Sequence, residues 1–208
     1  MSTNNMANTW NKLIDNKIFC IVWSVVALAY SFILPFCWGN DPMTETGTLS
    51  LLCETPARMP FFWIWAILTA DAFLLNVEHM FRKYGYHGKG LQITLLLAVV
   101  SVLLIALTLG HDITTWNPKR IAHWAATVGY IVFLAATILL FFLLQLKSNH
   151  SFWKALALGA AILLLVALWF FILGKSGLME IVPMALMLVL LLVVNFTGFV
   201  PTTESYRG

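Results

Sequence analysis

The sequence predicts an all-α integral membrane protein, a bundle of six transmembrane helices in a single membrane domain over residues 1–208. The chain is 61% hydrophobic and only 10% charged, whereas soluble domains are about 45–50% apolar and about 25% charged. In addition, the apolar residues fall into six runs. Each run is close to the roughly 20 residues that a membrane-spanning helix requires.

Each run is expected to be helical, because a segment exposed to lipid must satisfy its own backbone hydrogen bonds. The alternating segments of about ten residues that mark a transmembrane β-barrel are not visible. Turn and helix-start residues separate the runs, for example Pro60 and the pair Asn117 and Pro118. The expected spans are 18–38, 60–81, 91–110, 121–146, 152–174 and 178–199.

The first 17 residues are polar over too long a stretch for a secretory signal, and no small-residue cleavage site follows the first apolar run. We therefore expect that run to be a retained span. The formal charge of +3 is too small to suggest a nucleic-acid partner. Membrane lipids are the expected partners, and the sequence leaves open a homo-oligomer or a protein partner in the membrane.

The distribution of Lys and Arg predicts the orientation, because cytoplasmic loops carry an excess of these residues. With the N-terminus inside, the inner segments hold Lys12, Lys17, Arg82, Lys83, Lys89, Lys147, Lys154 and Arg207, and the outer links hold Arg58, Lys119, Arg120 and Lys175. The excess favours cytoplasmic termini in an inner or plasma membrane. Lys119 and Arg120 are the main evidence against this orientation.

The link and helix start from Gly110 to Tyr130 carry the densest group of titratable side chains beside an apolar run. His123 opens the fourth span and is the expected proton-transfer residue, and Glu180, which opens the last span, is expected to orient it. Asp112 is a third catalytic candidate. Glu54 and His111 are expected to help bind a substrate at the same outer face.

Two other interpretations of this outer group are open. It could be a structural network that ties helix ends together, or it could bind zinc. The chain has no HExxH motif, no CxxC pair and no third outer His, so we assign no metal and no cofactor.

Asp71 lies near the middle of the second span. Inserting an ionisable group there costs about 2.5–3.5 kcal/mol, so we expect Asp71 to have a stabilising partner or a function. A hydrogen bond from Ser24, Tyr30, Thr69 or Tyr130, or from a water, could stabilise it. Asp71 and Tyr130 could line the bottom of a binding cavity. Alternatively, Asp71 could simply clip two helices together, or it could be the coupling group of a small transporter.

Cys37 and Cys53 flank the longest outer link. In an oxidising compartment they could form a disulfide closing a loop of about 15 residues, worth roughly 3 kcal/mol. The alternative is two small buried thiols.

Three stretches resemble one known family: TETGTLSLLCETPARMPFF before and into the second span, RIAHWAATVGYIVF in the fourth, and SGLMEIVPM at the last. They are similar to the six-helix DRAM-like membrane proteins, a grouping that includes eukaryotic proteins linked to remodelling of GPI-anchor lipids. The resemblance implies that Glu54, His123 and Glu180 converge outside. The chain lacks the Asp of the family's Ser-Asp-x-Gly element, because Leu51 follows Ser50.

A weaker likeness, to intramembrane zinc hydrolases that act on ceramides, fails because most of the required His ligands are missing. The sequence therefore predicts a membrane protein with a polar outer-facing site that binds or modifies a lipid or other amphiphile. It does not decide whether the protein is an enzyme. The alternative is a non-enzymatic transporter, channel subunit or scaffold that uses Asp71.

Overall fold

The computed structural model describes residues 3–39, 41–44, 47–53, 55–110, 117–174 and 176–201. Within these ranges the chain is helical, with turns and short irregular links between the helices and no strand. In chain order the elements are α1 (Thr3–Asp15), α2 (Lys17–Ile33), the 3₁₀ helix η1 (Leu34–Gly39), α3 (Leu49–Leu52), α4 (Met59–Lys83), α5 (Lys89–Leu107), α6 (Pro118–Gln145), α7 (Phe152–Leu173) and α8 (Gly177–Phe196).

The predicted fold class is confirmed. Six helices are long and apolar enough to cross a membrane, and they coincide with the six expected runs. The first span changes character near its end, where α2 continues as η1 from Leu34. Pro35 has no backbone N–H and cannot donate the next α-helical hydrogen bond. The chain is thus a multi-pass membrane protein.

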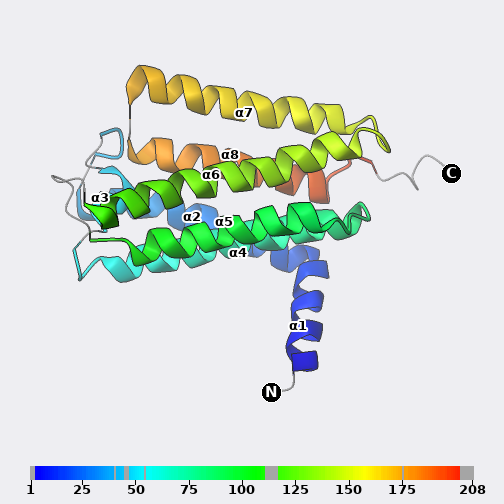
Figure 1. Cartoon of the computed structure of the whole chain (residues 1–208), viewed down its shortest axis with the longest axis horizontal. Coiled ribbons are helices and arrows are strands. Elements are labelled where there is room, and N and C mark those ends of the chain that lie inside the picture. The colour runs from blue at the N-terminus through cyan, green and yellow to red at the C-terminus, as the bar shows by residue number, and fades with distance from the viewer. Residues whose placement is uncertain are drawn as a thin grey trace.

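The six spans run side by side, whereas α1 projects at a steep angle from one end of the bundle (Figure 1). We call that end the α1 end; it also holds the α4–α5 and α6–α7 turns. The opposite end, called the α3 end, holds α3 and its neighbouring links. Helices α5 and α6 form the most extensive contact. The span α8 is the most buried and α7 the least.

Aromatic packing fills the core toward the α1 end. Phe81, Phe141 and Phe152 are almost fully buried, and the ring centroids of Phe81 and Phe141 lie 5.3 Å apart. The Tyr84 ring meets the edge of Phe152 at 4.8 Å, within the range for favourable aromatic pairs. These contacts join the ends of α4, α6 and α7.

Polar side chains link the helices in the same half of the bundle, although the side-chain oxygens of Asn76 and Asn195 are buried without a described partner. Asn76 of α4 donates to Ser24 Oγ of α2 at 2.8 Å, and Asn195 of α8 donates to the Asn76 carbonyl oxygen at 2.9 Å. Lys83 Nζ donates to the carbonyl oxygens of Val194 and Asn195, at 3.0 and 2.6 Å. A cation is well placed there, because the last carbonyls of a helix have no partner within it.

At the α3 end, the link before α3 (described over residues 41–44 and 47–48) is held against the start of α8. The backbone N–H of Leu178 donates to the Pro42 carbonyl oxygen at 3.0 Å. Gly177 lies so close to Gly47 that a Cβ at position 177 would overlap the Gly47 carbonyl group. The contact therefore requires a residue without a side chain at position 177, and it fixes the link over this end of the bundle.

Candidate functional site

His123 lies in the second turn of α6, and the start of this helix is capped. Asn117 accepts a hydrogen bond from the Arg120 N–H at 2.9 Å through its side-chain oxygen, and Pro118 occupies the first helical position. Both features are typical of helix N-termini. The imidazole of His123 points inward, with only 6% of the residue exposed.

The hydrogen bonds of Thr108 indicate which nitrogen of His123 carries the proton. Thr108 Oγ1 lies 2.6 Å from the Leu104 carbonyl oxygen and 3.1 Å from His123 Nδ1. A hydroxyl has one proton, and the short contact to the carbonyl oxygen uses it. This geometry favours the tautomer in which His123 Nδ1–H donates to Thr108, and a neutral ring in that tautomer has its lone pair on Nε2. His123 is therefore held as a potential base at the α3 end.

Glu180 lies in the first turn of α8 and holds the link. Its Oε2 accepts a hydrogen bond from the Leu49 backbone N–H at 2.7 Å, which is the first N–H of α3. A carboxylate is also favourable at the start of α8, because helix N-termini carry partial positive charge. The contact gives Glu180 a clear structural role, whereas the expected orientation of His123 by Glu180 stays a prediction.

Three residues predicted for this site, Glu54, His111 and Asp112, lie outside the described residues. Their convergence on His123 therefore stays a prediction. Within the described ranges, no group of three or more His, Cys, Asp or Glu residues could hold a metal ion.

Asp71 is the central residue of the 25-residue helix α4. Within the described part of the chain it has no hydrogen-bond or ion-pair partner. The expected hydrogen bonds are not formed: Tyr30 donates to the Phe61 carbonyl oxygen, and Ser24 donates to that of Cys20. Asp71 is half-buried and follows the strongly exposed Ile67 by one turn, so it lies at the edge of the lipid-facing surface of α4.

Thr69 and Tyr130 line a small void between α4, α5 and α6, together with Phe62, Trp65, Ala66, Val102 and Ile105. The hydroxyls of both residues are buried and lack a partner among the described residues. The void has room for about one water molecule, which could bridge two such hydroxyls. A second void, beside Leu95 and Leu134, is equally small. Neither void could hold a lipid chain.

In the structure Cys37 and Cys53 are both free thiols, and the possible disulfide between them stays a prediction. Cys37 Sγ lies 3.6 Å from the Ile33 carbonyl oxygen, one turn earlier in the chain. Cys53 is fully buried in the core cluster at the α3 end. Cys53 fits the alternative of a small buried thiol, whereas Cys37 is only partly buried.

Sequence reasoning missed the hydrogen bonds that position His123 and Glu180. Thr108 follows α5 and looked like part of an apolar run, and Leu49 contributes only its backbone N–H. An acidic residue in the first turn of a helix was the one visible signal for the role of Glu180. No pattern within one span indicates which residue of another span it meets.

No protein-family model matches the chain, and no match was found among curated proteins or among solved structures. The resemblance to the DRAM-like proteins therefore stays a prediction.

We expect Cys53 to react with iodoacetamide much more slowly than an exposed cysteine thiol. Burial raises the pKa of the Cys53 thiol from 9.0 to about 11. At pH 8 the reactive thiolate is then about 100-fold scarcer than in an ordinary thiol, and the reaction should accelerate as the pH rises toward 11. Mass spectrometry of the alkylated protein, with denatured protein as control, measures this. Resistance of Cys37 and Cys53 to alkylation in denatured, unreduced protein would reveal a bridge and contradict the free thiols.

Proposed function

We propose that the α3 end carries a polar site that binds the headgroup of a lipid or other amphiphile, with His123 as the proton-transfer residue. The observation that supports this most is the buried imidazole, whose Nδ1 is tied to Thr108 at 3.1 Å. A base held in one tautomer by a second residue is the arrangement that proton transfer requires. The same arrangement could also accept a hydrogen bond from a headgroup.

In this proposal Glu180 supports the site indirectly, by holding the link before α3. Its hydrogen bond to Leu49 N and the contact between Gly177 and Gly47 keep the link in place at the α3 end. Glu54, His111 and Asp112 would supply further charged groups beside His123. Since neither void among the described helices could hold a lipid chain, we place the headgroup at the end of the bundle and the chain along its lipid-facing surface.

The distribution of cations and the family resemblance support the membrane assignment and the ligand class. The excess of Lys and Arg falls at the α1 end, so the α3 end faces outward if the positive-inside rule applies. The DRAM-like proteins include members linked to lipid remodelling, in keeping with an amphiphile as ligand. We therefore propose an inner or plasma membrane with cytoplasmic termini.

His123→Ala should lower the retention of added phosphatidylethanolamine by at least about tenfold, or 1.4 kcal/mol, because the headgroup loses its hydrogen-bonding partner. Native mass spectrometry of the detergent-solubilised protein measures the bound lipid. Thr108→Val should have a smaller effect in the same direction, since it frees the imidazole without removing it. The matched control is His150→Ala, which changes an exposed histidine at the α1 end.

Glu180→Gln tests whether Glu180 acts only by holding Leu49. Glutamine retains an oxygen that can accept from Leu49 N, so the variant should keep its fold and most of its lipid. Unchanged lipid retention in His123→Ala would refute the proposed site. Loss of folded protein in both His123→Ala and Thr108→Val would instead show that the imidazole is part of a structural network.

A second candidate function rests on Asp71. A charged carboxylate at the centre of a span is costly unless it is paired, and Asp71 has no partner among the described residues. Binding of a proton or a cation would remove that cost. Asp71 would then be the coupling group of a small transporter or channel subunit, and the α3 end would be structural.

If Asp71 couples transport, Asp71→Asn should abolish proton flux into proteoliposomes under an imposed pH gradient, because an amide cannot take up and release the proton. The fluorescence of an enclosed pH-sensitive dye measures the flux. Glu78→Gln is the matched control, since it removes the other carboxyl of α4 nearer the α1 end. A flux that Asp71→Asn leaves unchanged, or the absence of flux in the unaltered protein, would exclude this function.

A further inference from the structure

Helix α1 projects from the bundle near one end, at a steep angle to the spans (Figure 1). Lys17, at the start of α2, follows α1 after one residue, and Arg82, near the end of α4, bonds to α1. Cations at the ends of spans mark the boundary between the hydrocarbon and the headgroups. Helix α1 is thus at the depth of the headgroups, where a helix perpendicular to the spans lies in the plane of the membrane.

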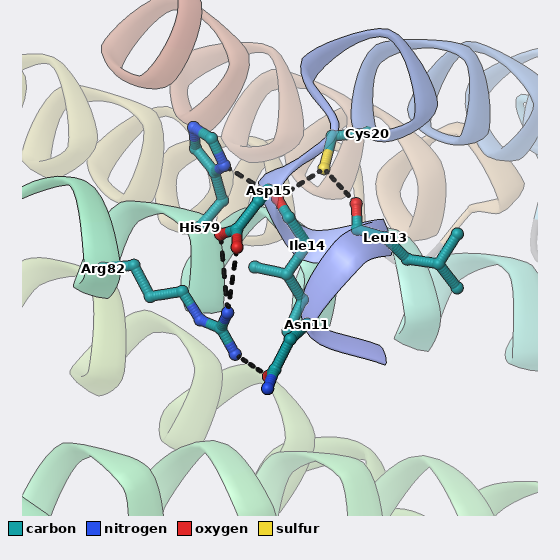
Figure 2. A network of polar contacts seen from close by, with 7 residues as sticks. All are labelled: Asn11, Leu13, Ile14, Asp15, Cys20, His79 and Arg82. Carbon is teal, nitrogen blue, oxygen red and sulfur yellow. Dashed lines mark hydrogen bonds and ion pairs between the residues drawn. The ribbon is translucent and has the colours of Figure 1, made fainter. Parts of the chain in front are cut away.

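The last turn of α1 is fixed to α2 and α4 (Figure 2). Arg82 donates to Asn11 Oδ1 at 2.6 Å and pairs with Asp15 at 3.4 Å. The Ile14 carbonyl oxygen lies 2.8 Å from His79 Nδ1 and 3.5 Å from Cys20 Sγ. Since the carbonyl groups at the end of a helix have no partner within it, these contacts complete the end of α1 and fix its direction.

The turn between α1 and α2 is a single residue. Asn16 separates the two helices, and its side chain caps α2 by accepting from the Phe19 N–H at 3.1 Å. Such a short, capped turn leaves little freedom for α1 to swing. The angle between α1 and the spans is therefore built into the fold.

One side of α1 is apolar and the other is polar. The apolar side follows the i, i+3, i+4 spacing of a single helix face and consists of Trp10, Leu13 and Ile14. Ile14 is fully buried, and Trp10 and Leu13 are partly buried. Asn8 and Lys12, on the opposite side, are exposed. Because Ile14 packs against Leu75 of α4, the apolar side faces the spans and hence the hydrocarbon.

The exposed charge beside this surface is positive. Asp15 is paired with Arg82, whereas Lys12 and Lys17 are exposed and have no ion-pair partner among the described residues. We propose that α1 is an in-plane membrane-surface helix whose apolar side, through Trp10, enters the headgroup region, and which selects anionic phospholipids through Lys12 and Lys17. Both parts follow from the physics of interfacial helices.

Spin labels on the two sides of α1 test its position. In full-length protein whose three cysteines are replaced by alanine, Trp10→Cys and Asn8→Cys each carry one label in lipid nanodiscs. The label at position 10 should collide mainly with oxygen, which concentrates in lipid. The label at position 8 should collide mainly with a water-soluble nickel chelate. Equal access of both labels to nickel, or shielding of both from both reagents, would overturn the proposal. The second outcome would indicate a protein partner or a second copy.

The lipid selectivity is tested with Lys12→Gln/Lys17→Gln. The ratio of phosphatidylglycerol to phosphatidylcholine that the protein retains should fall at least about fivefold in this variant. Each lysine close to an anionic membrane surface strengthens binding to that surface by about this factor. Lys147→Gln/Lys154→Gln alters two exposed cations of the same end and should lower the ratio less, because the α6–α7 turn lies on the other side of the bundle from α1 (Figure 1). An equal fall in both pairs, or none in the first, would overturn the selectivity.

Discussion

The structure depends most on the polar contacts that α4 makes with the helices around it. Asn76 bonds to α2 and accepts from α8, Lys83 caps the end of α8, and Arg82 holds α1. Toward the α3 end, Trp63 donates to a carbonyl oxygen of α5 and Trp65 to Ser31 of α2. In hydrocarbon, apolar contact alone does not favour one helix partner over lipid, so such hydrogen bonds and close packing specify the arrangement.

The two ends of the bundle differ because the polar residues of α4 make different contacts along the length of the helix. Near the α1 end Asn76, His79, Arg82 and Lys83 of α4 bond to neighbouring helices. Lys12 and Lys17 beside them have no ion-pair partner among the described residues. At its centre Asp71 has no described partner. At the α3 end the polar groups of the proposed site belong to other helices: His123 of α6 meets Thr108 after α5, and Glu180 of α8 holds the link before α3. The proposed functions are therefore separated along the membrane normal.

The sequence sufficed to predict the fold class and all six spans, because both follow from composition and length. It did not reveal α1, although Trp10, Leu13 and Ile14 carried the signal in a segment that looked merely polar. It also suggested Thr69 as a partner of Asp71. Two residues apart on a helix are about 200° apart around its axis, so the buried Thr69 and the half-exposed Asp71 point in different directions. Contacts between spans, such as Thr108 with His123, depend on helix rotation, which one sequence does not specify.

A double-mutant cycle on Asn76 and Ser24 tests the central role of α4 most directly. The free energy of unfolding in mixed detergent micelles would be measured for Asn76→Ala, Ser24→Ala and the double variant. If the 2.8 Å hydrogen bond between them helps to hold α2 on α4, the two substitutions should be coupled by about 0.6–1.7 kcal/mol. Strictly additive effects, with no coupling, would contradict the account of α4 as the helix that organises the bundle.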